Sequence, residues 1–298
     1  MELPNWLSCL SGIPDRRRGE RVLVFIQAYV DESWGEEVFV FSALIGSVGS
    51  WVRITDEWDA CLRESPSVRH FKMDEAFGLD NEFYQFTQAE RDNKLRRLCS
   101  IINTQELTQL CATMVLSDFG KHFQPYVGRP ASEPYFFPFQ MVNAGLGTHV
   151  GMMGLNQPCE VFFDENKIFG PRAKAWYPVI KENFPAEIKR VMPVEPFFRS
   201  DKDVLPLQCA DLTAWMMRNA NEKGCGEFEW VWDAINKIRM SDLSDTIDED
   251  WWKKMYEHEA SPEERERAIL VLKSYRETFG HDWPPKTKIE KKRHTGRL

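Results

Sequence analysis

The stretch VLVFIQAYVDESWG, residues 22 to 35, decides the fold because a run of strand-forming residues ends in two adjacent carboxylates. Apolar and aromatic residues dominate 22 to 31, which predicts a largely buried strand. Asp31 and Glu32 stand at the end of that run. An isolated charge is costly to bury, so carboxylates in this place must be hydrogen-bonded, paired or bound to a metal ion. The stretch therefore predicts a central strand and a candidate site beside it.

Strand and helix patterns alternate along the chain from this strand to residue 220. A second strand is expected over 36 to 46, joined to the first by a tight connection at Trp34 and Gly35. Beyond it we expect helices over 51 to 64 and 89 to 105, a strand over 108 to 118, a helix over 132 to 154, a strand over 159 to 165, a partly helical segment over 171 to 184, extended sequence over 188 to 198 and a helix over 205 to 219. A hairpin followed by strands separated by helices is typical of an α/β fold with a mixed sheet.

The chain divides into three parts by its patterns. We expect an N-terminal extension at 1 to 21, an α/β domain at 22 to 220, and a helical, strand-free accessory region with a basic tail at 221 to 298. The acidic stretch 241 to 267 predicts packed helices that bind a basic protein partner or a second copy of the chain, as a homodimer. The tail KTKIEKKRHTGRL at 286 to 298 either contacts phosphate or is a solvated chain end.

Composition bounds the class of protein. A chain of 298 residues with 43% hydrophobic and 13% aromatic content can bury a sizeable core. Its net charge of −8 speaks against a surface that coats nucleic acid throughout. The longest apolar stretch, 38 to 51, is too short and too rich in Ser and Gly to span a bilayer, and the N-terminus lacks a secretory pattern, so we expect no membrane association and a cytoplasmic location. The seven cysteines are expected to be reduced, buried thiols.

Two further aspartates are candidates to meet Asp31. Asp164 follows the strand CEVFF, and Asp211 lies on the apolar, inward face of the last predicted helix, where it cannot cap the helix. Carboxylates from two strand ends and a helix suit Mg²⁺ or Mn²⁺, and two such ions can activate water and stabilise the leaving oxygen of a phosphodiester. Each aspartate also has a structural explanation: a turn residue, a helix cap and an ion-pair partner, respectively.

These motifs resemble those of a known family. YVDES at 29 to 33, FFDEN at 162 to 166 and FFRSDKDVLPLQCADLTAW at 197 to 215 resemble the signature of the uncharacterised-domain family numbered 3800, which is regarded as having an RNase H-like, retroviral-integrase-type fold. The resemblance spans about 22 to 220. It implies that Asp31, Asp164 and Asp211 are metal ligands and that Glu32 is a possible fourth acid. Family members often occur near mobile elements or phage-defence genes, which implies a role of that kind.

The chain departs from the family pattern at two places. Trp34 stands between DES and Gly35, where the family usually has Gly directly after DES. The family also tends to carry an acid before a hydrophobe and a Lys or His after the first helix, whereas this chain has the triplet His70, Phe71, Lys72. Asp74 or Glu75 could take the role of that acid, and a solvent-exposed helix start explains both equally well.

Other polar residues near the motifs are candidate substrate contacts. Lys72 and Lys202 could neutralise a phosphate as point charges, and Ser200 and Gln208 lie close to Asp211 in the sequence. A candidate basic footprint follows Asp164 and consists of Lys167, Arg172, Lys174, Lys181, Lys189 and Arg190. Ordinary solvation of surface side chains is the competing explanation for all of them.

The sequence as a whole predicts a divalent-metal-dependent nuclease that hydrolyses or transfers phosphodiesters in DNA or RNA. The alternative from another class is a catalytically silent RNase H-like scaffold that acts through a protein partner. A glycosidase that uses two of the carboxylates is less favoured, because no aromatic-rich sugar platform is evident around them. The histidines show no zinc-binding spacing and GxSxG is absent, so neither a zinc site nor a serine hydrolase is predicted.

Overall fold

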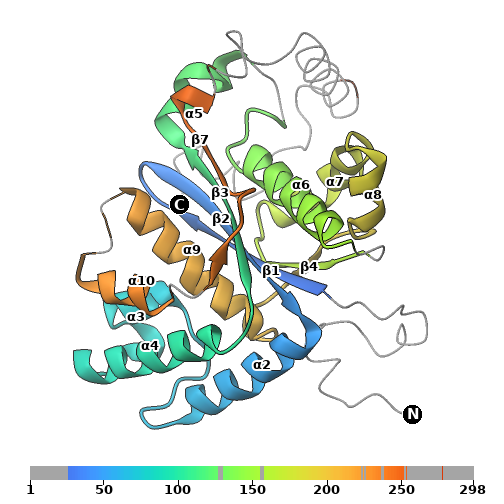
Figure 1. The fold of residues 1–298 in the computed structure, drawn as a ribbon. Helices are drawn as coiled ribbons and strands as arrows, with labels where there is room; N and C mark the ends of the chain where they lie inside the picture. The colour runs from blue at the N-terminus through green and yellow to red at the C-terminus, as the bar shows by residue number, and fades with distance from the viewer. Residues whose placement is uncertain are drawn as a thin grey trace, which may run out of the picture.

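A seven-stranded mixed sheet forms the centre of the computed structural model, which describes residues 26 to 126, 130 to 154, 158 to 222, 224, 226 to 235, 238 to 251, 253 and 277 (Figure 1). The strand order is β5-β4-β1-β2-β3-β6, with β7 also paired to β3. The strands are β1 (Ile26–Trp34), β2 (Val38–Ser47), β3 (Thr108–Val115), β4 (Glu160–Asp164), β5 (Phe197–Arg199), β6 (Arg239–Met240) and β7 (Asp245–Ile247). The α/β class with a mixed sheet is therefore as predicted.

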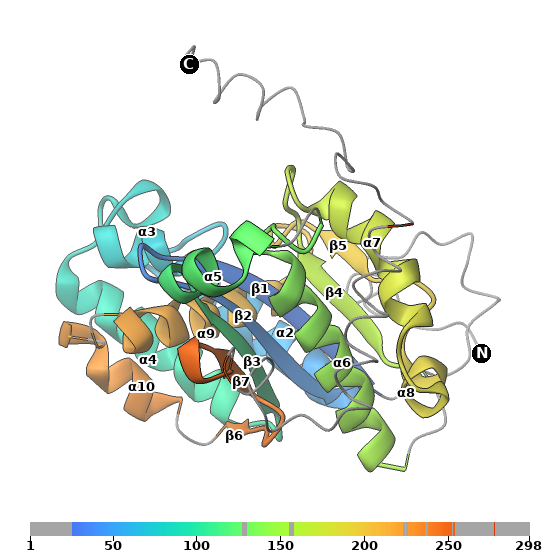
Figure 2. The same cartoon turned by 90° about the horizontal axis from the view of Figure 1, so that it is seen from above.

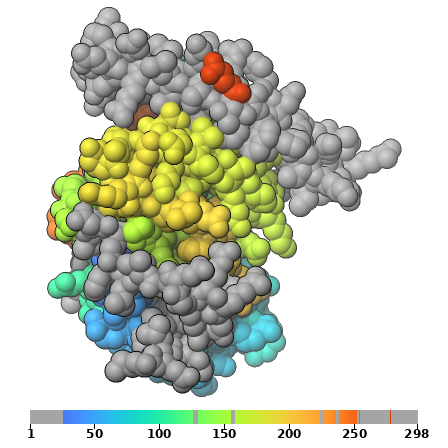
Figure 3. Space-filling model, turned by 90° about the vertical axis from the view of Figure 1, so that its right-hand side faces the viewer, coloured from blue at the N-terminus to red at the C-terminus, as the bar shows by residue number. Residues whose placement is uncertain are grey.

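Helices cover both faces of this sheet, and each face has its own hydrophobic core (Figures 1 and 2). On one face lie α6 (Phe136–Met152), α7 (Gly170–Glu182) and α8 (Ala186–Val191). On the other lie α2 (Val48–Arg63), α3 (Met73–Gly78), α4 (Gln88–Asn103), α9 (Pro206–Glu222) and α10 (Glu229–Ala234). The helix α5 (Leu116–His122) follows β3, and short 3-10 helices occur at Asn81–Phe83, Gln124–Tyr126 and Gly226–Phe228. Figure 3 shows α7 and α8 (yellow) forming much of the described surface on their side.

The hairpin between β1 and β2 is held by the last residue of α9. The Glu222 carboxylate accepts hydrogen bonds from the main-chain N–H groups of Glu37 (2.8 Å) and Val38 (3.2 Å). A Cβ atom at Gly35 would lie only 1.8 Å from Glu222 Oε1, so a side chain at this position would clash with the carboxylate. Since α9 also packs along β1 and β2, this contact fixes the helix that carries Asp211 against the sheet.

The structure corrects the predicted position of Asp31. We expected a strand that ends there, but β1 continues to Trp34, and residues 22 to 25 lie outside the described residues. The parallel ladder with β4 stops at Val30, whereas the antiparallel ladder with β2 continues to Trp34. Beyond Val30, β1 is therefore paired with β2 and no longer with β4. Asp31 is the first β1 residue after the end of the β4 ladder.

Several other predicted ends of helices and strands also differ from the structure. The strand expected over 108 to 118 ends at Val115, directly before α5. The segment 188 to 198 was expected to contain extended sequence; it starts with the end of α8, and β5 begins only at Phe197. The short helix α3 begins at Met73, so Asp74 and Glu75 lie in its first turn, as the alternative of a helix start at these residues predicted. The elements α3, α8 and β5 span three to six residues, which is too short for a period to delimit them.

The prediction of a strand-free region after residue 220 is wrong as well. Both β6 and β7 belong to this region, and both pair in parallel with β3. They cover the outer edge of β3 with strands of two and three residues, a common way to protect a sheet edge. Most of the predicted acidic helices at 241 to 267, and all of the basic tail at 286 to 298, lie outside the described residues.

Two expectations from composition can be compared with the described residues. The five cysteines among them, Cys61, Cys99, Cys111, Cys159 and Cys209, are buried and free. None of the helices described combines the length and the apolar content that crossing a membrane requires.

Candidate functional site

Four aspartates surround the side-chain ammonium of Lys72. Its Nζ lies 3.1 Å from Asp164 Oδ2, 3.1 Å from Asp201 Oδ2, 3.3 Å from Asp211 Oδ1 and 3.6 Å from Asp31 Oδ2. The structure thus brings together the three aspartates singled out in the sequence and adds Asp201, which was missed. We call these five residues the Lys72 cluster.

The sheet and α9 together place the acids of the Lys72 cluster. Asp164 ends β4 and pairs in register with Arg199, which ends β5, so the turn carrying Asp201 starts beside it. Asp31 follows directly after the last β1 residue that pairs with β4. Asp211 comes from α9, which packs across β1. The carboxyl ends of parallel strands are where α/β sheets commonly bind ligands, and this cluster lies there.

Main-chain donors orient three of the four carboxylates. In each, one oxygen accepts a hydrogen bond from a backbone N–H and the other faces Lys72 Nζ. The donors are Glu32 N to Asp31 Oδ1 (2.8 Å), Asp201 N to Asp164 Oδ1 (3.2 Å) and Met73 N to Asp211 Oδ2 (2.7 Å). The oxygens that face Nζ are therefore held in place by the fold and not by the lysine alone.

Gln208 holds the segments on either side of the Lys72 cluster. It is fully buried, and its Oε1 accepts hydrogen bonds from Trp58 Nε1 (2.9 Å) and Phe71 N (3.3 Å). Its Nε2 donates to the carbonyl oxygen of Asp201 (2.9 Å). The amide thus joins the residue before Lys72 to the turn after β5, which is a positioning role and differs from the substrate contact that we expected of it.

The other predicted substrate contacts lie in the same turn. Ser200 accepts main-chain hydrogen bonds from Asp203 (3.0 Å) and Val204 (3.1 Å) through its carbonyl oxygen, and its Oγ accepts one from Lys202 N (3.3 Å). The Lys202 side chain is exposed. Of the two lysines expected to meet phosphate, only Lys202 is therefore placed at the surface next to the cluster.

Glu32 projects from the opposite face of β1, because successive strand residues alternate. Its Oε1 accepts a hydrogen bond from Asn166 Nδ2 (2.5 Å), while Oε2 is buried and has no hydrogen-bond partner among the described residues. Asn166 is itself fixed, since its Oδ1 accepts from the main-chain N–H groups of Ile168 (2.9 Å) and Phe169 (2.8 Å). Burial raises the pKa of Glu32 to about 7, although the Asn166 hydrogen bond opposes the shift.

Burial also raises the pKa values of Asp31, Asp164 and Asp211, and the attraction of Lys72 lowers them by a smaller amount. For Lys72, burial alone would lower the pKa, but the attraction of the four aspartates outweighs it and the pKa is raised. One positive charge thus faces four acidic groups. The site is short of positive charge even with the ammonium in place.

The two acids proposed as replacements for the missing family acid lie elsewhere. Asp74 accepts a hydrogen bond from Trp215 Nε1 (2.6 Å) and pairs with Arg218 (3.4 Å). Glu75 contacts the His70 ring and the backbone of Glu82 instead. Neither is among the carboxylates that contact Lys72, and the additional acid of the cluster is Asp201.

The predicted basic footprint after Asp164 is only partly available. Arg172 is buried and pairs with Glu133 (3.4 Å), and Lys189 pairs with Glu182 (3.0 Å). Lys181 donates to the carbonyl oxygen of Pro193 (2.7 Å). The exposed basic residues of this set are Lys167, Lys174 and Arg190.

A second group of potential metal ligands lies on the other side of the sheet from α9. Ligand atoms of Asp118, His122 and Glu249 lie within 4.8 Å of one another, and among the described residues no other group of three His, Cys, Asp or Glu does so. We call it the Asp118 group. The acids of the Lys72 cluster are spread further apart by the ammonium between them. This group was not predicted, because Glu249 is far from His122 along the chain.

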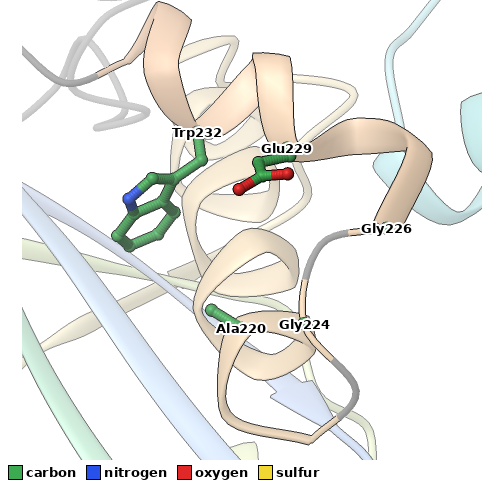
Figure 4. Close-up of a pocket in the computed structure, with 5 residues that line it drawn as sticks. All are labelled: Ala220, Gly224, Gly226, Glu229 and Trp232. Carbon is green, nitrogen blue, oxygen red and sulfur yellow. The ribbon is translucent and has the colours of Figure 1, made fainter.

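A shallow pocket of about 270 Å³ lies between the end of α9 and α10 and contains none of these residues (Figure 4). It is lined by Ala220, Gly224, Gly226, Glu229 and Trp232. It offers one carboxylate and one indole and no converging polar groups. The Lys72 cluster therefore remains the candidate site.

Comparisons with family models, with curated proteins and with solved structures give no match for this chain. The relationship to the family numbered 3800 accordingly stays a prediction from the motifs. What the site can do has to be argued from its own geometry.

Proposed function

We propose that this protein is a divalent-metal-dependent nuclease of RNase H-like fold, which hydrolyses or transfers phosphodiester bonds. The observation that carries the proposal is the Lys72 cluster, in which four aspartates from β1, β4, the turn after β5 and α9 converge on one cation position. The sheet order β5-β4-β1-β2-β3, with antiparallel β1, β2 and β3 and parallel β1, β4 and β5, supports the RNase H-like arrangement.

The residues of the cluster fit Mg²⁺ or Mn²⁺. All of the converging ligand atoms are carboxylate oxygens, the donors that these hard cations prefer. Asp31, Asp164 and Asp211 would hold the ion, with Asp201 beside them, and main-chain donors already orient the first three. When bound, the ion would supply Lewis-acid stabilisation of the phosphate oxygens and lower the pKa of water.

Glu32 would accept a proton in such a reaction, because its carboxylate interacts electrostatically with Asp164 and Lys72 of the cluster although it projects from the opposite face of β1. Its buried Oε2 has no hydrogen-bond partner among the described residues, and its pKa of about 7 lies near neutral pH, where a general base is most effective. Asn166 would fix the orientation of the carboxylate through Oε1. Exposed Lys202 would then offer a positive charge to the backbone of DNA or RNA.

The biological setting follows from the motifs alone. A role in phage defence or in mobile-element biology rests on the resemblance to the family numbered 3800, in which such associations are common. A cytoplasmic location and a protein partner or homodimer formed through the C-terminal region belong to the same set of proposals.

One observation favours the second candidate, a catalytically silent scaffold. The Lys72 ammonium already contacts all four aspartates, so the acids have a counter-ion without any metal. A site that uses lysine permanently in this way would need no ion and would perform no hydrolysis. The two candidates therefore differ in whether the cluster binds a divalent cation.

Metal titration combined with a cleavage assay separates the two candidates. Single- and double-stranded DNA and RNA are incubated with the wild type in Mg²⁺, Mn²⁺ or EDTA, and Mn²⁺ binding is measured by calorimetry. Asp31→Asn, Asp164→Asn and Asp211→Asn should each lose metal binding and cleavage together, while Asp203→Asn, an exposed neighbour in the turn after β5, should lose neither. Absence of Mn²⁺ binding by the wild type at millimolar concentration would leave the scaffold as the better description.

A further inference from the structure

We propose that Lys72 is an exchangeable counter-ion: its ammonium offsets part of the negative charge of the four aspartates in the metal-free protein and leaves them when a divalent cation binds. This inference rests on the proposed function, because it concerns the same site. It adds a role for Lys72 that differs from a phosphate contact and from a permanent structural ion pair.

The first support is that the ammonium and a metal ion cannot share the cluster. The oxygens of the four aspartates lie 3.1 to 3.6 Å from Nζ. Mg²⁺ requires oxygen ligands at about 2.0 to 2.1 Å. An ion bound by these oxygens would therefore sit where Nζ sits, and the carboxylates would close around it only after the ammonium had gone.

The second support is that the carboxylates do not depend on Lys72 for their orientation. One oxygen of Asp31, of Asp164 and of Asp211 is held by a main-chain N–H. The oxygens that face Nζ have no other hydrogen-bond partner among the described residues. Withdrawal of the ammonium would thus leave oriented ligands and expose the oxygens that a cation needs.

The third support is the attachment of Lys72. The backbone around it is fixed by Phe71 N to Gln208 and by Met73 N to Asp211, and the Lys72 carbonyl accepts from Ala76 N (3.0 Å). Lys72 is the N-cap residue of α3, and its side chain is 28% exposed. Four flexible side-chain bonds can therefore carry the ammonium to solvent while the backbone stays in place.

Charge provides the driving force for the exchange. A single ammonium faces four acidic groups, and a divalent cation would double the positive charge at the same position. Buried charges are strongly destabilising when left unpaired, which explains why a metal-free protein would retain a lysine here. The lysine stabilises the metal-free cluster and competes with the ion for the same carboxylates.

Amine labelling of the wild type tests the exchange directly. The intact chain is treated briefly with an acetylating reagent at pH 8, in EDTA or in saturating Mg²⁺, and acetylation of each lysine is quantified by mass spectrometry. Labelling of Lys72 should rise at least about fivefold with Mg²⁺, while exposed Lys167 and Lys202 serve as internal references. Unchanged labelling of Lys72 in a protein that calorimetry shows to be metal-loaded would overturn the inference and leave the proposed function intact.

A substitution gives the second, independent readout. Lys72→Met should bind Mn²⁺ at least about tenfold more tightly than the wild type, because the competitor is gone, and its Tm in EDTA should fall by roughly 10 °C because the acids lose their counter-ion. Lys121→Met, which changes an exposed lysine of α5, should alter neither value. Equal Mn²⁺ affinity of Lys72→Met and wild type would overturn the exchange, whereas failure of both to bind Mn²⁺ would instead reject the proposed function.

Discussion

The Lys72 cluster and the Asp118 group differ in how their acids are held. In the cluster, main-chain N–H groups fix three carboxylates that point at one position. In the Asp118 group the ligand atoms lie closer together, but the Glu249 carboxylate pairs with Lys253 (3.0 Å) and its side chain is 41% exposed. Asp118 Oδ2 accepts the main-chain N–H of Glu249 (2.9 Å). Short distances between ligand atoms therefore do not show that the ligands are oriented for a metal ion. In the Lys72 cluster, three carboxylates are oriented toward one position by the main chain.

The largest expected effect is stabilisation of the fold by Mn²⁺, which shows whether the Lys72 cluster or the Asp118 group binds the metal ion. Mn²⁺ at a thousand times its Kd should stabilise the wild type by about 4 kcal/mol against chemical denaturation, since it binds only the folded state. Asp211→Asn should abolish this gain, and Asp118→Asn should keep it. The reverse result, with the gain lost only in Asp118→Asn, would assign the metal to the Asp118 group and invert the comparison.

A smaller effect is expected from the residue that positions the cluster. Gln208→Met should lower the free energy of unfolding by roughly 2 to 3 kcal/mol, because it leaves the buried donors Trp58 Nε1 and Phe71 N without an acceptor. Mn²⁺ affinity should fall as well, since the turn with Asp201 loses its tie. Urea denaturation and calorimetry measure both quantities. A variant that loses stability but keeps full affinity would show that the cluster is held without Gln208.

The third prediction concerns Glu32, on the other face of β1 from Asp31, and the pH dependence of the free energy of unfolding. Burial raises the Glu32 pKa from 4.5 to about 7, so in EDTA its ionisation removes stability as pH rises between these values, and it contributes no penalty below pH 4.5. Partial solvent access screens the penalty, so Glu32→Gln should be about 1 to 2 kcal/mol more stable than wild type at pH 8 and equal at pH 4.5. Thermal unfolding at both pH values provides the measurement. A variant that is less stable at pH 8 would show that ionised Glu32 is stabilising.

The smallest effect concerns the Asp118 group alone. His122→Ala should change the free energy of unfolding by less than about 1 kcal/mol and leave the Mn²⁺ affinity of the protein unaltered, as expected for a half-buried side chain with only long contacts. Its Nε2 lies 3.9 Å from Glu249 Oε1. Urea denaturation with and without Mn²⁺ measures both. A clear loss of Mn²⁺ affinity would mean that this group also binds the ion.

The sequence predicted the three aspartates because each has a local signature. Asp31 and Asp164 follow apolar strand patterns, and Asp211 interrupts the apolar face of a helix. Their convergence follows from topology, since parallel β1 and β4 lie side by side and α9 packs across them. Long, periodic elements were therefore enough to place them, even though the strand boundary at Asp31 was wrong.

Local sequence patterns could not predict that Asp201 belongs to the cluster or that Lys72 lies at its centre. Asp201 lies in a turn, SDKD, whose acidic residues look alike in the sequence, and only the turn geometry selects the first of them. Lys72 precedes a helix of six residues that no period reveals. Its contact with all four acids depends on the Gln208 hydrogen bonds, which join segments far apart in the chain. Such details are fixed by tertiary contacts and not by local pattern.

The pairing of β6 and β7 with β3 has a consequence for shortened forms of the chain. Without these strands, the outer edge of β3 would present free N–H and C=O groups over residues such as Cys111 and Thr113. Such an edge is a template for strands of other molecules. A chain cut after Glu222 would therefore tend to form intermolecular sheets. By covering the edge of β3, β6 and β7 oppose this form of aggregation.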